Sequence, residues 1–284
     1  MNIDHIIQQA QELGKKNWVH AMHILNSAAD ELPDEPRLQT SLAELFLIRL
    51  QYSNALKHYL RALSFQPDNQ NLIQAIASCY LGQREYRLAL VYFQRIKNQS
   101  DDVLYNIGYT QALLGKNREC IETMRKLLKR LPNHPYVYYV IIEQFYELGE
   151  LDEAIRYLKN AQTLSGDHMQ LSVFAGLIYS TKGQDMLAYY HYSKASKMGR
   201  INNPDHMIRY AMSALKAGLP REALKILQEC EKYWPYLSEI YVNQMRTYLF
   251  LGDKKKAAEV LKRAKKNVSR LSPALRLMEE RLKD

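Results

Sequence analysis

The residues best able to do chemistry are few and scattered along this chain. Three cysteines, none in a Cys-x-x-Cys pair, exclude a disulfide framework and a thiolate zinc site. His20 and His23 would share one helix face, but a metal site needs a further ligand. Glu279 and Glu280 are adjacent, and no arrangement of serine, histidine and aspartate is inferable. We therefore predict no catalytic residue, no metal site and no cofactor, and a protein that is not an enzyme.

The composition is that of a globular, helical protein. The chain has 284 residues, of which 47% are hydrophobic, which is too many for a disordered chain. Only 11 glycines and 9 prolines are present, which argues against an all-β fold with many tight hairpins. No glycine-rich phosphate loop is present, so binding of a nucleotide is not expected.

The net charge of +9 is concentrated near the end of the sequence. Residues 253–284 hold eleven Lys/Arg and five Asp/Glu, so +6 of the +9 lies there. A basic surface permits acidic partners, nucleic acid or anionic lipid. Two explanations stay open: a solvated end face, and a docking patch for an acidic partner.

Targeting and membrane signals are absent from the sequence pattern. Residues 1–5 form no basic stretch followed by an apolar run, so we expect no signal peptide. No run of about 18 apolar residues occurs, so we expect no membrane span. We expect a cytoplasmic location.

A period of 34 residues runs through the chain. Small residues recur at one phase of it, in steps of 34 residues except for one of 31 and one of 35: Ala21, Ala55, Ala89, Cys120, Ala154, Ala188, Ala223 and Ala257. A second series lies seven residues later: Ala28, Ala62, Ile96, Leu127, Ala161, Ala195, Cys230 and Ala264. A larger apolar residue lies between each pair, and this spacing of four and three marks one face of an α-helix.

Helix breakers recur at the same period. Proline follows the second series by five residues at Pro33, Pro67, Pro132 and Pro235, where a helix must stop. Glycine precedes the first series by five residues at Gly115, Gly149, Gly183, Gly218 and Gly252. Each repeat is therefore predicted to be helix, short turn, helix, short turn. The small residues let the two antiparallel helices of a pair approach closely.

These positions resemble the tetratricopeptide repeat. The family pattern has Leu at position 7, Gly or Ala at 8, Tyr at 11, Ala at 20 and 27, and Pro at 32. The stretch from Tyr105 through Gly108 to Pro132 fits it well, although Cys120 replaces the alanine. The resemblance covers almost the whole chain, and it implies an all-α, right-handed superhelical solenoid of about eight antiparallel helix pairs plus a C-terminal capping helix.

The eight predicted repeats form one array over residues 1–271. Their bounds are 2–35, 36–69, 70–100, 101–134, 135–168, 169–203, 204–237 and 238–271. Three depart from the pattern. Repeat 1 is expected to have a turn two residues longer at Lys15–Asn17, so that Ile3, Ile6, Ile7 and Ala10 face the core. Repeat 3 is about three residues short near Lys97–Ser100, and repeat 6 has one extra residue near Gly199–Asn203.

Residues 272–284 are predicted to form the capping helix. Ser272 is a suitable N-cap residue, and Pro273 suits the first helical position. Leu271, Leu275, Met278 and Leu282 would cover the last repeat, while Lys283 would face water. A solenoid needs such a polar terminal cap.

The resemblance also implies a binding groove. In such solenoids the first helix of each repeat, here called a first helix, lines the concave side. Mapping the ligand-facing positions onto this sequence gives polar residues early (Glu12, Glu44, Asn71, Gln74 and Ser78). The middle repeats give a cluster rich in tyrosine: Tyr105, Asn106, Tyr109, Tyr136, Tyr139, Glu143 and Tyr146. The late repeats give Arg209, Lys216, Asn243 and Arg246. Tyrosine is enriched at binding hot spots, and an asparagine amide donates and accepts at once.

The preferred interpretation is a scaffold or adaptor that binds a protein partner or an extended peptide in this groove. The subclass that clamps chaperone carboxylates needs lysine where this chain has Gln74 and Tyr136, asparagine where it has Ser78, and arginine where it has Val140, so that specificity is not predicted. Two alternatives stay open. One is an RNA-binding helical repeat protein, since a family of basic helical arrays with a similar period binds RNA. The other is a structural subunit of a secretion or envelope assembly, and the chain could also form a homo-oligomer.

Overall fold

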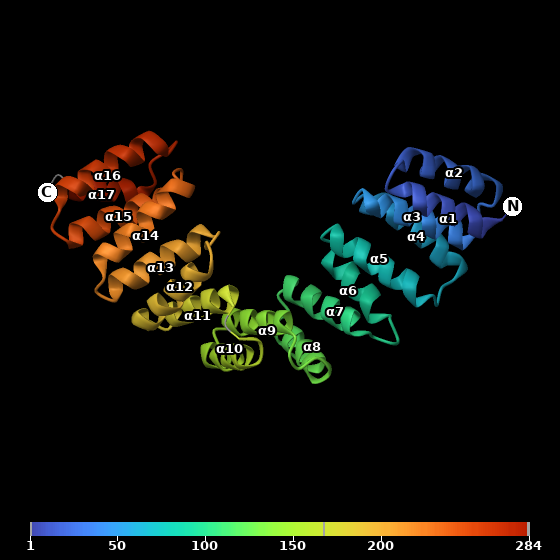
Figure 1. Cartoon of the computed structure of the whole chain (residues 1–284), viewed down its shortest axis with the longest axis horizontal. Coiled ribbons are helices and arrows are strands. Elements are labelled where there is room, and N and C mark those ends of the chain that lie inside the picture. The colour runs from blue at the N-terminus through green and yellow to red at the C-terminus, as the bar shows by residue number, and fades with distance from the viewer. Residues whose placement is uncertain (1, 167, 283–284) are drawn as a thin grey trace. The chain divides into compact units, whose positions relative to one another are not determined.

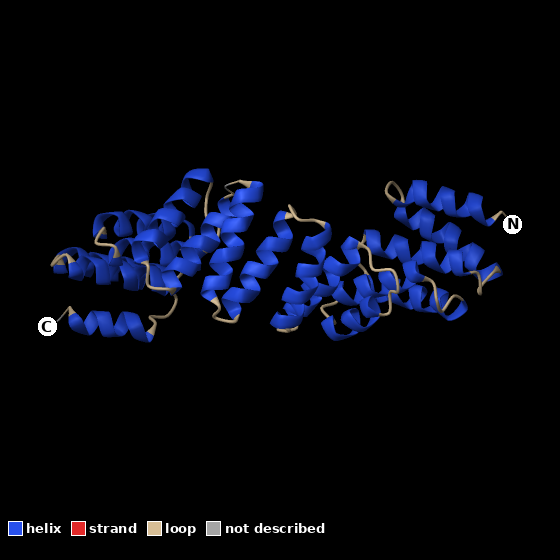
Figure 2. Ribbon diagram, turned by 90° about the horizontal axis from the view of Figure 1, so that it is seen from below, coloured by secondary structure: helices blue, strands red, loops and turns tan. Residues whose placement is uncertain are grey.

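The protein consists of helices joined by short turns. The computed structural model describes residues 2–166 and 168–282, and that part contains helices and loops but no strand (Figure 2). Within it the helices are α1 (Ile3–Gly14), α2 (Trp18–Glu31), α3 (Pro36–Ile48), α4 (Tyr52–Phe65), α5 (Gln70–Gly82), α6 (Tyr86–Gln94), α7 (Asp101–Leu113), α8 (Asn117–Arg130), α9 (Pro135–Glu147), α10 (Leu151–Ser165), α11 (Met169–Thr181), α12 (Asp185–Met198), α13 (Pro204–Lys216), α14 (Pro220–Tyr233), α15 (Ser238–Phe250), α16 (Lys254–Asn267) and α17 (Pro273–Arg281) (Figure 1).

The chain divides into two compact units, where the sequence predicts one continuous array. The N-terminal unit is residues 1–144 and the C-terminal unit is residues 145–284, with the division inside α9. Within each unit, consecutive helices pack as antiparallel pairs, and each pair packs on the next. The fold is an all-α helical repeat solenoid. Residues 1, 167, 283 and 284, and with them the expected position of Lys283, lie outside the described residues.

The small residues of the 34-residue period form the centre of each helix pair. All eight members of the first series, from Ala21 to Ala257, have fully buried side chains. The second series is buried as well, with at most 4% of any side chain exposed. A close helix–helix approach therefore accounts for the period, and the sequence prediction of these positions is confirmed.

In three repeats, the side chain at the fourth position forms a hydrogen bond to the proline near the end of the preceding repeat. Tyr138 donates a hydrogen bond to the carbonyl of Pro132 (3.1 Å), and Tyr241 donates to that of Pro235 (2.6 Å). The Gln39 amide donates to Pro33 in the same way (3.3 Å). Each of these prolines lies just past the end of α2, α8 or α14, so the bond ties the turn between two repeats to the first helix of the next repeat.

The turn within the helix pairs of repeats 2 to 8 contains a left-handed residue. Gly115, Gly149, Gly183, Gly218 and Gly252 have φ between 69° and 81°. At the equivalent place in repeats 2 and 3 the chain has Leu50 (φ 54°) and Arg84 (φ 64°). A side chain is disfavoured in this conformation, which costs about 1–2 kcal/mol per residue.

Replacing Leu50 by glycine should therefore stabilise the protein. Leu50 is 69% exposed, so little apolar burial is lost, and its turn keeps the bond from the Gln51 amide to the Phe46 carbonyl (3.0 Å). We expect a gain of about 0.5–1 kcal/mol after the greater freedom of glycine in the unfolded chain is subtracted. Urea unfolding of L50G and R84G against the wild type measures it, and an unchanged or lower midpoint in both would exclude strain at these turns.

The structure corrects one detail of repeat 1. The expected longer turn is wrong, because α1 ends at Gly14 and α2 begins at Trp18, which leaves the same three turn residues as in the other pairs. The expected core face is confirmed, since Ala10 is fully buried in a cluster that also receives Ile3, Ile6 and Ile7. At the end of α1, a Cβ on Gly14 would lie 2.6 Å from Leu45 Cδ2, so the bare backbone of α1 packs directly on α3.

The irregular repeats 3 and 6 are confirmed. Helix α6 has nine residues, against fourteen in α4, and the chain leaves it at Arg95. Ile96 still reaches its core position with 4% exposed, and the Lys97 amide donates to the Gln70 side chain (2.8 Å). In repeat 6, residues 199–203 connect α12 to α13, as the extra residue there predicts.

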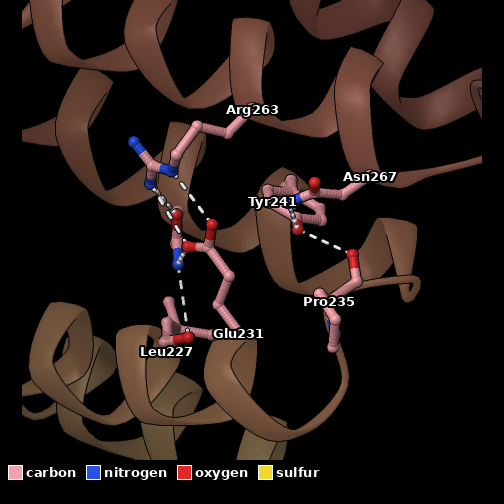
Figure 3. A network of polar contacts seen from close by, with 7 residues as sticks. Leu227, Glu231, Pro235, Tyr241, Arg263 and Asn267 are labelled. Atoms are coloured by element: carbon pink, nitrogen blue, oxygen red, sulfur yellow. Dashed lines mark hydrogen bonds and ion pairs between the residues drawn. The ribbon is translucent and has the colours of Figure 1, made fainter.

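The C-terminal repeat is held by a polar network and covered by α17. The Glu231 carboxylate of α14 accepts hydrogen bonds from Arg263 of α16 (2.9 and 3.2 Å) and from Gln244 of α15 (2.8 Å) (Figure 3). Nearby, Asn267 donates to the Tyr241 hydroxyl (2.9 Å). Each bond joins two different helices, so the network fixes how α14, α15 and α16 pack.

The capping helix is built as predicted. The Ser272 hydroxyl accepts a hydrogen bond from the Leu275 amide, and Pro273 is the first helical residue. Leu275 and Met278 are buried against the last repeat, and Leu271 and Leu282 pack on the same cluster.

Candidate functional site

Helices α7 and α9 position the middle cluster of tyrosines. On α7, Val103, Leu104 and Ile107 are buried in the core, which leaves Tyr105 and Tyr109 on the opposite, accessible side. The Ser100 hydroxyl caps α7 by accepting from the Val103 amide (3.3 Å). On α9, burial of residues 137, 138, 141 and 142 leaves Tyr136 and Tyr139 accessible. Helical periodicity alone thus brings the four tyrosines to one side of the pair of first helices.

The rings form one continuous series. Tyr109 stacks on Tyr105 with centroids 6.3 Å apart and planes at 5°. Tyr105 lies 6.4 Å from the His134 ring, which lies 6.0 Å from Tyr136, and Tyr136 meets Tyr139 edge to face at 5.9 Å. These separations lie within the range of favourable aromatic pairs. We call these five residues the aromatic row.

His134 is the member that sequence reasoning missed. Its imidazole bridges the α7 tyrosines to the α9 tyrosines, and it lies in the turn just before Pro135. The only available signal was an aromatic side chain directly before a helix-starting proline, next to two predicted groove positions. That signal says nothing about which way the ring turns.

The row is accessible yet partly desolvated. Tyr136 is 62% exposed and Tyr109 is 40% exposed, while Tyr105 and Tyr139 are half-buried. Burial raises the pKa of the Tyr105 hydroxyl, and the neighbouring Tyr109 and Tyr136 add to this shift. Burial and then Tyr136 raise the pKa of Tyr139. Both hydroxyls therefore stay protonated at neutral pH and can donate hydrogen bonds to a ligand.

A cavity of about 360 Å³ opens at one end of the aromatic row. It lies between α7, α8 and α9 and combines aromatic, aliphatic and acidic walls: Asp101, Asp102, Tyr105, Leu127, Leu131, His134 and Tyr136. The Nδ1 atom of His134 is buried and has no hydrogen-bond partner among the described residues. A buried polar atom left without a partner is costly unless water or a ligand satisfies it.

Asn106 and Glu143 flank the row. Asn106 is half-buried on α7, and its side chain makes no hydrogen bond to the described part of the chain. Its amide is therefore open to a ligand. Glu143 is exposed on α9, one helical turn beyond Tyr139.

The C-terminal unit has a groove of its own. It encloses about 670 Å³, and three predicted residues line it: Tyr146, Arg209 and Lys216. The Tyr146 hydroxyl lies 3.1 Å from that of Thr181, and Lys216 lies 3.9 Å from the Asp185 carboxylate. Arg209 is exposed and makes no ion pair with the described residues.

A half-buried histidine, His206, shares this groove. Burial, and next the charge of Arg209, lower the pKa of His206, so its ring is neutral at neutral pH. The acidic side chains Asp205 and Glu239 also line the groove. The arrangement suits a polar partner segment that offers both donors and acceptors.

Asn243 does not belong to the site. It is 3% exposed, its amide nitrogen donates to the Glu239 carbonyl (3.0 Å), and its amide oxygen accepts from Arg246 (3.5 Å). Asn243 and Asn106 occupy the same position of their repeats, but the amide of Asn243 is satisfied within α15 and closed to a ligand. Arg246 remains exposed on α15.

Two comparisons with known proteins bear on this fold. A family model described as tetratricopeptide repeat matches residues 102–134, which include α7 and α8. A solved tetratricopeptide repeat protein from Parabacteroides merdae superposes with a TM-score of 0.63 at 13% identity, over 88% of this chain and 99% of that one. Residues 102–134 thus match the tetratricopeptide repeat, and the chain shares the fold of a solved protein built from such repeats. Tetratricopeptide repeats are a general scaffold for protein–protein interaction and are typically non-catalytic.

Other solved structures share the fold. PilF of Pseudomonas aeruginosa has a TM-score of 0.54 at 17% identity, over 73% of this chain and 94% of PilF. YrrB, described as a tetratricopeptide repeat protein with an unusual peptide-binding site, has a TM-score of 0.54 at 19% identity, over 68% of this chain and 97% of YrrB. No curated protein matches the sequence.

The three cysteines pack in the core. Burial raises the pKa of Cys79 to about 11 and those of Cys120 and Cys230 to about 12, so these thiols are unreactive packing residues. Among residues 2–166 and 168–282, no three His, Cys, Asp or Glu side chains are arranged to hold a metal ion. No helix in that part of the chain is both long and apolar enough to cross a membrane.

Proposed function

We propose that this protein is a non-catalytic adaptor that binds an extended peptide segment of a partner protein along its first helices. The observation that carries the proposal is the aromatic row, in which five rings from α7, the turn at residue 134 and α9 form one accessible series. A tyrosine gives a large apolar face and a hydroxyl while few rotatable bonds are immobilised, which is why such residues dominate binding energy at interfaces.

The polar neighbours of the row suit a peptide main chain. The Asn106 amide can donate to a backbone carbonyl and accept from a backbone N–H at the same time. The protonated hydroxyls of Tyr105 and Tyr139 add two donors. YrrB, which shares this fold, is described as having a peptide-binding site, and this is compatible with the proposal.

The C-terminal groove is proposed as a second contact for a partner segment. Tyr146, Arg209 and Lys216 line it, and Arg246 lies on the next first helix. Neither the RNA-binding nor the assembly-subunit alternative gains support from a particular observation.

We further propose a cytoplasmic setting. All three cysteines are buried, free thiols. Proteins of oxidising compartments more often use their cysteines in disulfides.

The test is a selection followed by a binding titration. A random dodecapeptide phage library is panned against the full chain, and the affinity of a selected, fluorescently labelled peptide is measured by anisotropy. Because each truncation removes a hot-spot ring, Y105A combined with Y139A should weaken binding at least about tenfold.

The control is Y190A combined with Y236A, which removes two tyrosines that are 58% and 62% exposed away from the row. It should leave the affinity unchanged. Equal affinity of both double variants and the wild type would remove the aromatic row from the binding site.

A further inference from the structure

The cavity at the end of the aromatic row has the chemistry of a cation site. The faces of Tyr105, Tyr136 and His134 form part of its wall, and aromatic faces attract an ammonium or guanidinium group placed over them. Leu127 and Leu131 complete the wall with aliphatic surface. Lysine and arginine side chains combine a methylene stem with a charged end, so they match such a wall along their whole length.

The charges at the rim favour a cation over an anion. Asp101 pairs with Arg130 (3.2 Å), which also donates to the Gln99 carbonyl (3.0 Å). Asp102 is exposed and makes no ion pair with the described residues, so its negative charge is left uncompensated. No lysine or arginine is part of the cavity wall. The Arg130–Asp101 pair shows that a guanidinium group is already accommodated at this rim.

The start of α7 does not offset this preference. A helix N-terminus attracts anions through its unpaired amides. Here the Ser100 hydroxyl occupies the Val103 amide, and Asp101 and Asp102 place two carboxylates in the first turn. The helix end is thus already supplied with negative charge, and a bound anion would meet both carboxylates.

We propose that this cavity binds a lysine or arginine side chain of the partner peptide, an inference that rests on the proposed function. The stem of that side chain lies against Leu127 and Leu131, and its charged end lies between the tyrosine rings and Asp102. His134 lines the same cavity, and its buried Nδ1 has no hydrogen-bond partner among the described residues.

The test uses peptides selected from the dodecapeptide library on the full chain. Selected peptides should carry lysine or arginine at one constant position. Replacing that residue by norleucine, which keeps the stem and removes the charge, should weaken binding to the wild type about tenfold. The same replacement should have little effect on D102N, because the charge partner is absent there.

The matched control is D30N. Asp30 is an exposed carboxylate on α2 in the same unit, so the variant changes the net charge equally but leaves the cavity intact. D30N should keep the full tenfold norleucine effect.

Three outcomes separate this inference from the proposed function. A norleucine effect lost in D102N and retained in D30N supports the cation site. Two results overturn the cation site and leave the proposed function standing. One is that the selected peptides depend on Tyr105 but carry an acidic or uncharged residue at the constant position. The other is an equal norleucine effect in D102N and D30N. Selected peptides that bind Y105A with Y139A as well as they bind the wild type overturn both.

Discussion

Replacing Gly176 by alanine is expected to lower the free energy of unfolding of the C-terminal unit by about 2 kcal/mol. A Cβ at this position of α11 would lie 2.7–2.8 Å from three ring atoms of Tyr192. The Tyr192 side chain on α12 is fully buried, so its ring has no room to withdraw. The effect is measured by urea unfolding followed by far-ultraviolet circular dichroism.

Gly108 provides the matched control, because it holds the same position in repeat 4. A Cβ there would meet the terminal methyl of Met124 at 2.5 Å, and a flexible methionine end can move aside. Alanine also gains helix propensity over glycine, about 0.5–1 kcal/mol. G108A should therefore be close to neutral. Similar losses in G108A and G176A, or a G176A penalty that persists in a Tyr192→Leu background, would contradict the packing argument.

Removing the Glu231 carboxylate should cost about 2–3 kcal/mol of unfolding free energy in the C-terminal unit. Glu231 accepts two hydrogen bonds from Arg263 and one from Gln244, whose side chain is fully buried. In E231A the amide of Gln244 keeps its bond to the Leu227 carbonyl (3.2 Å), but Arg263 loses both bonds to the carboxylate. The hydrogen bonds to Glu231 are also the first cause of the raised pKa of Arg263. Urea unfolding measures the loss.

Glu222 is the control on the same helix. It pairs with Lys225 one turn away (2.7 Å), and both side chains are largely exposed. Because exposed pairs contribute about 0–1 kcal/mol, E222A should shift the urea midpoint far less than E231A. If the two variants lose equal stability, the network of Figure 3 is only another surface ion pair.

The fold could be predicted because its determinants are local and repeat. Ala154 and Ala188 recur at one phase since each helix pair needs the same close approach, and both are fully buried. Gly183 marks a turn that needs a positive φ, which the structure shows as 72°. Spacing in the sequence records both requirements directly.

Other features depend on distant packing and leave no such record. The bare backbone of Gly14 at the end of α1 packs on Leu45 of α3, a contact that the spacing within repeat 1 does not reveal. Leu50 takes a left-handed conformation that its residue type disfavours, so only its place in the repeat indicated the turn. These are tertiary effects that override local preference.

The candidate site divides in the same way. Helical spacing placed Tyr105, Tyr109, Tyr136 and Tyr139 on one accessible side, as the structure shows. It did not foresee His134, because the direction of a turn residue's ring depends on its neighbours. It also assigned Asn243 to the groove, because position alone does not reveal that Glu239 and Arg246 satisfy its amide.

The most direct test of the peptide site is photo-crosslinking on the intact protein. A peptide selected from the library carries p-benzoylphenylalanine at successive positions, is irradiated with the full chain, and the crosslinked residues are identified by mass spectrometry. Binding along the aromatic row predicts crosslinks on α7 and α9 between residues 105 and 143. Crosslinks confined to α10 or the basic stretch 253–284 would place the partner elsewhere and contradict the account.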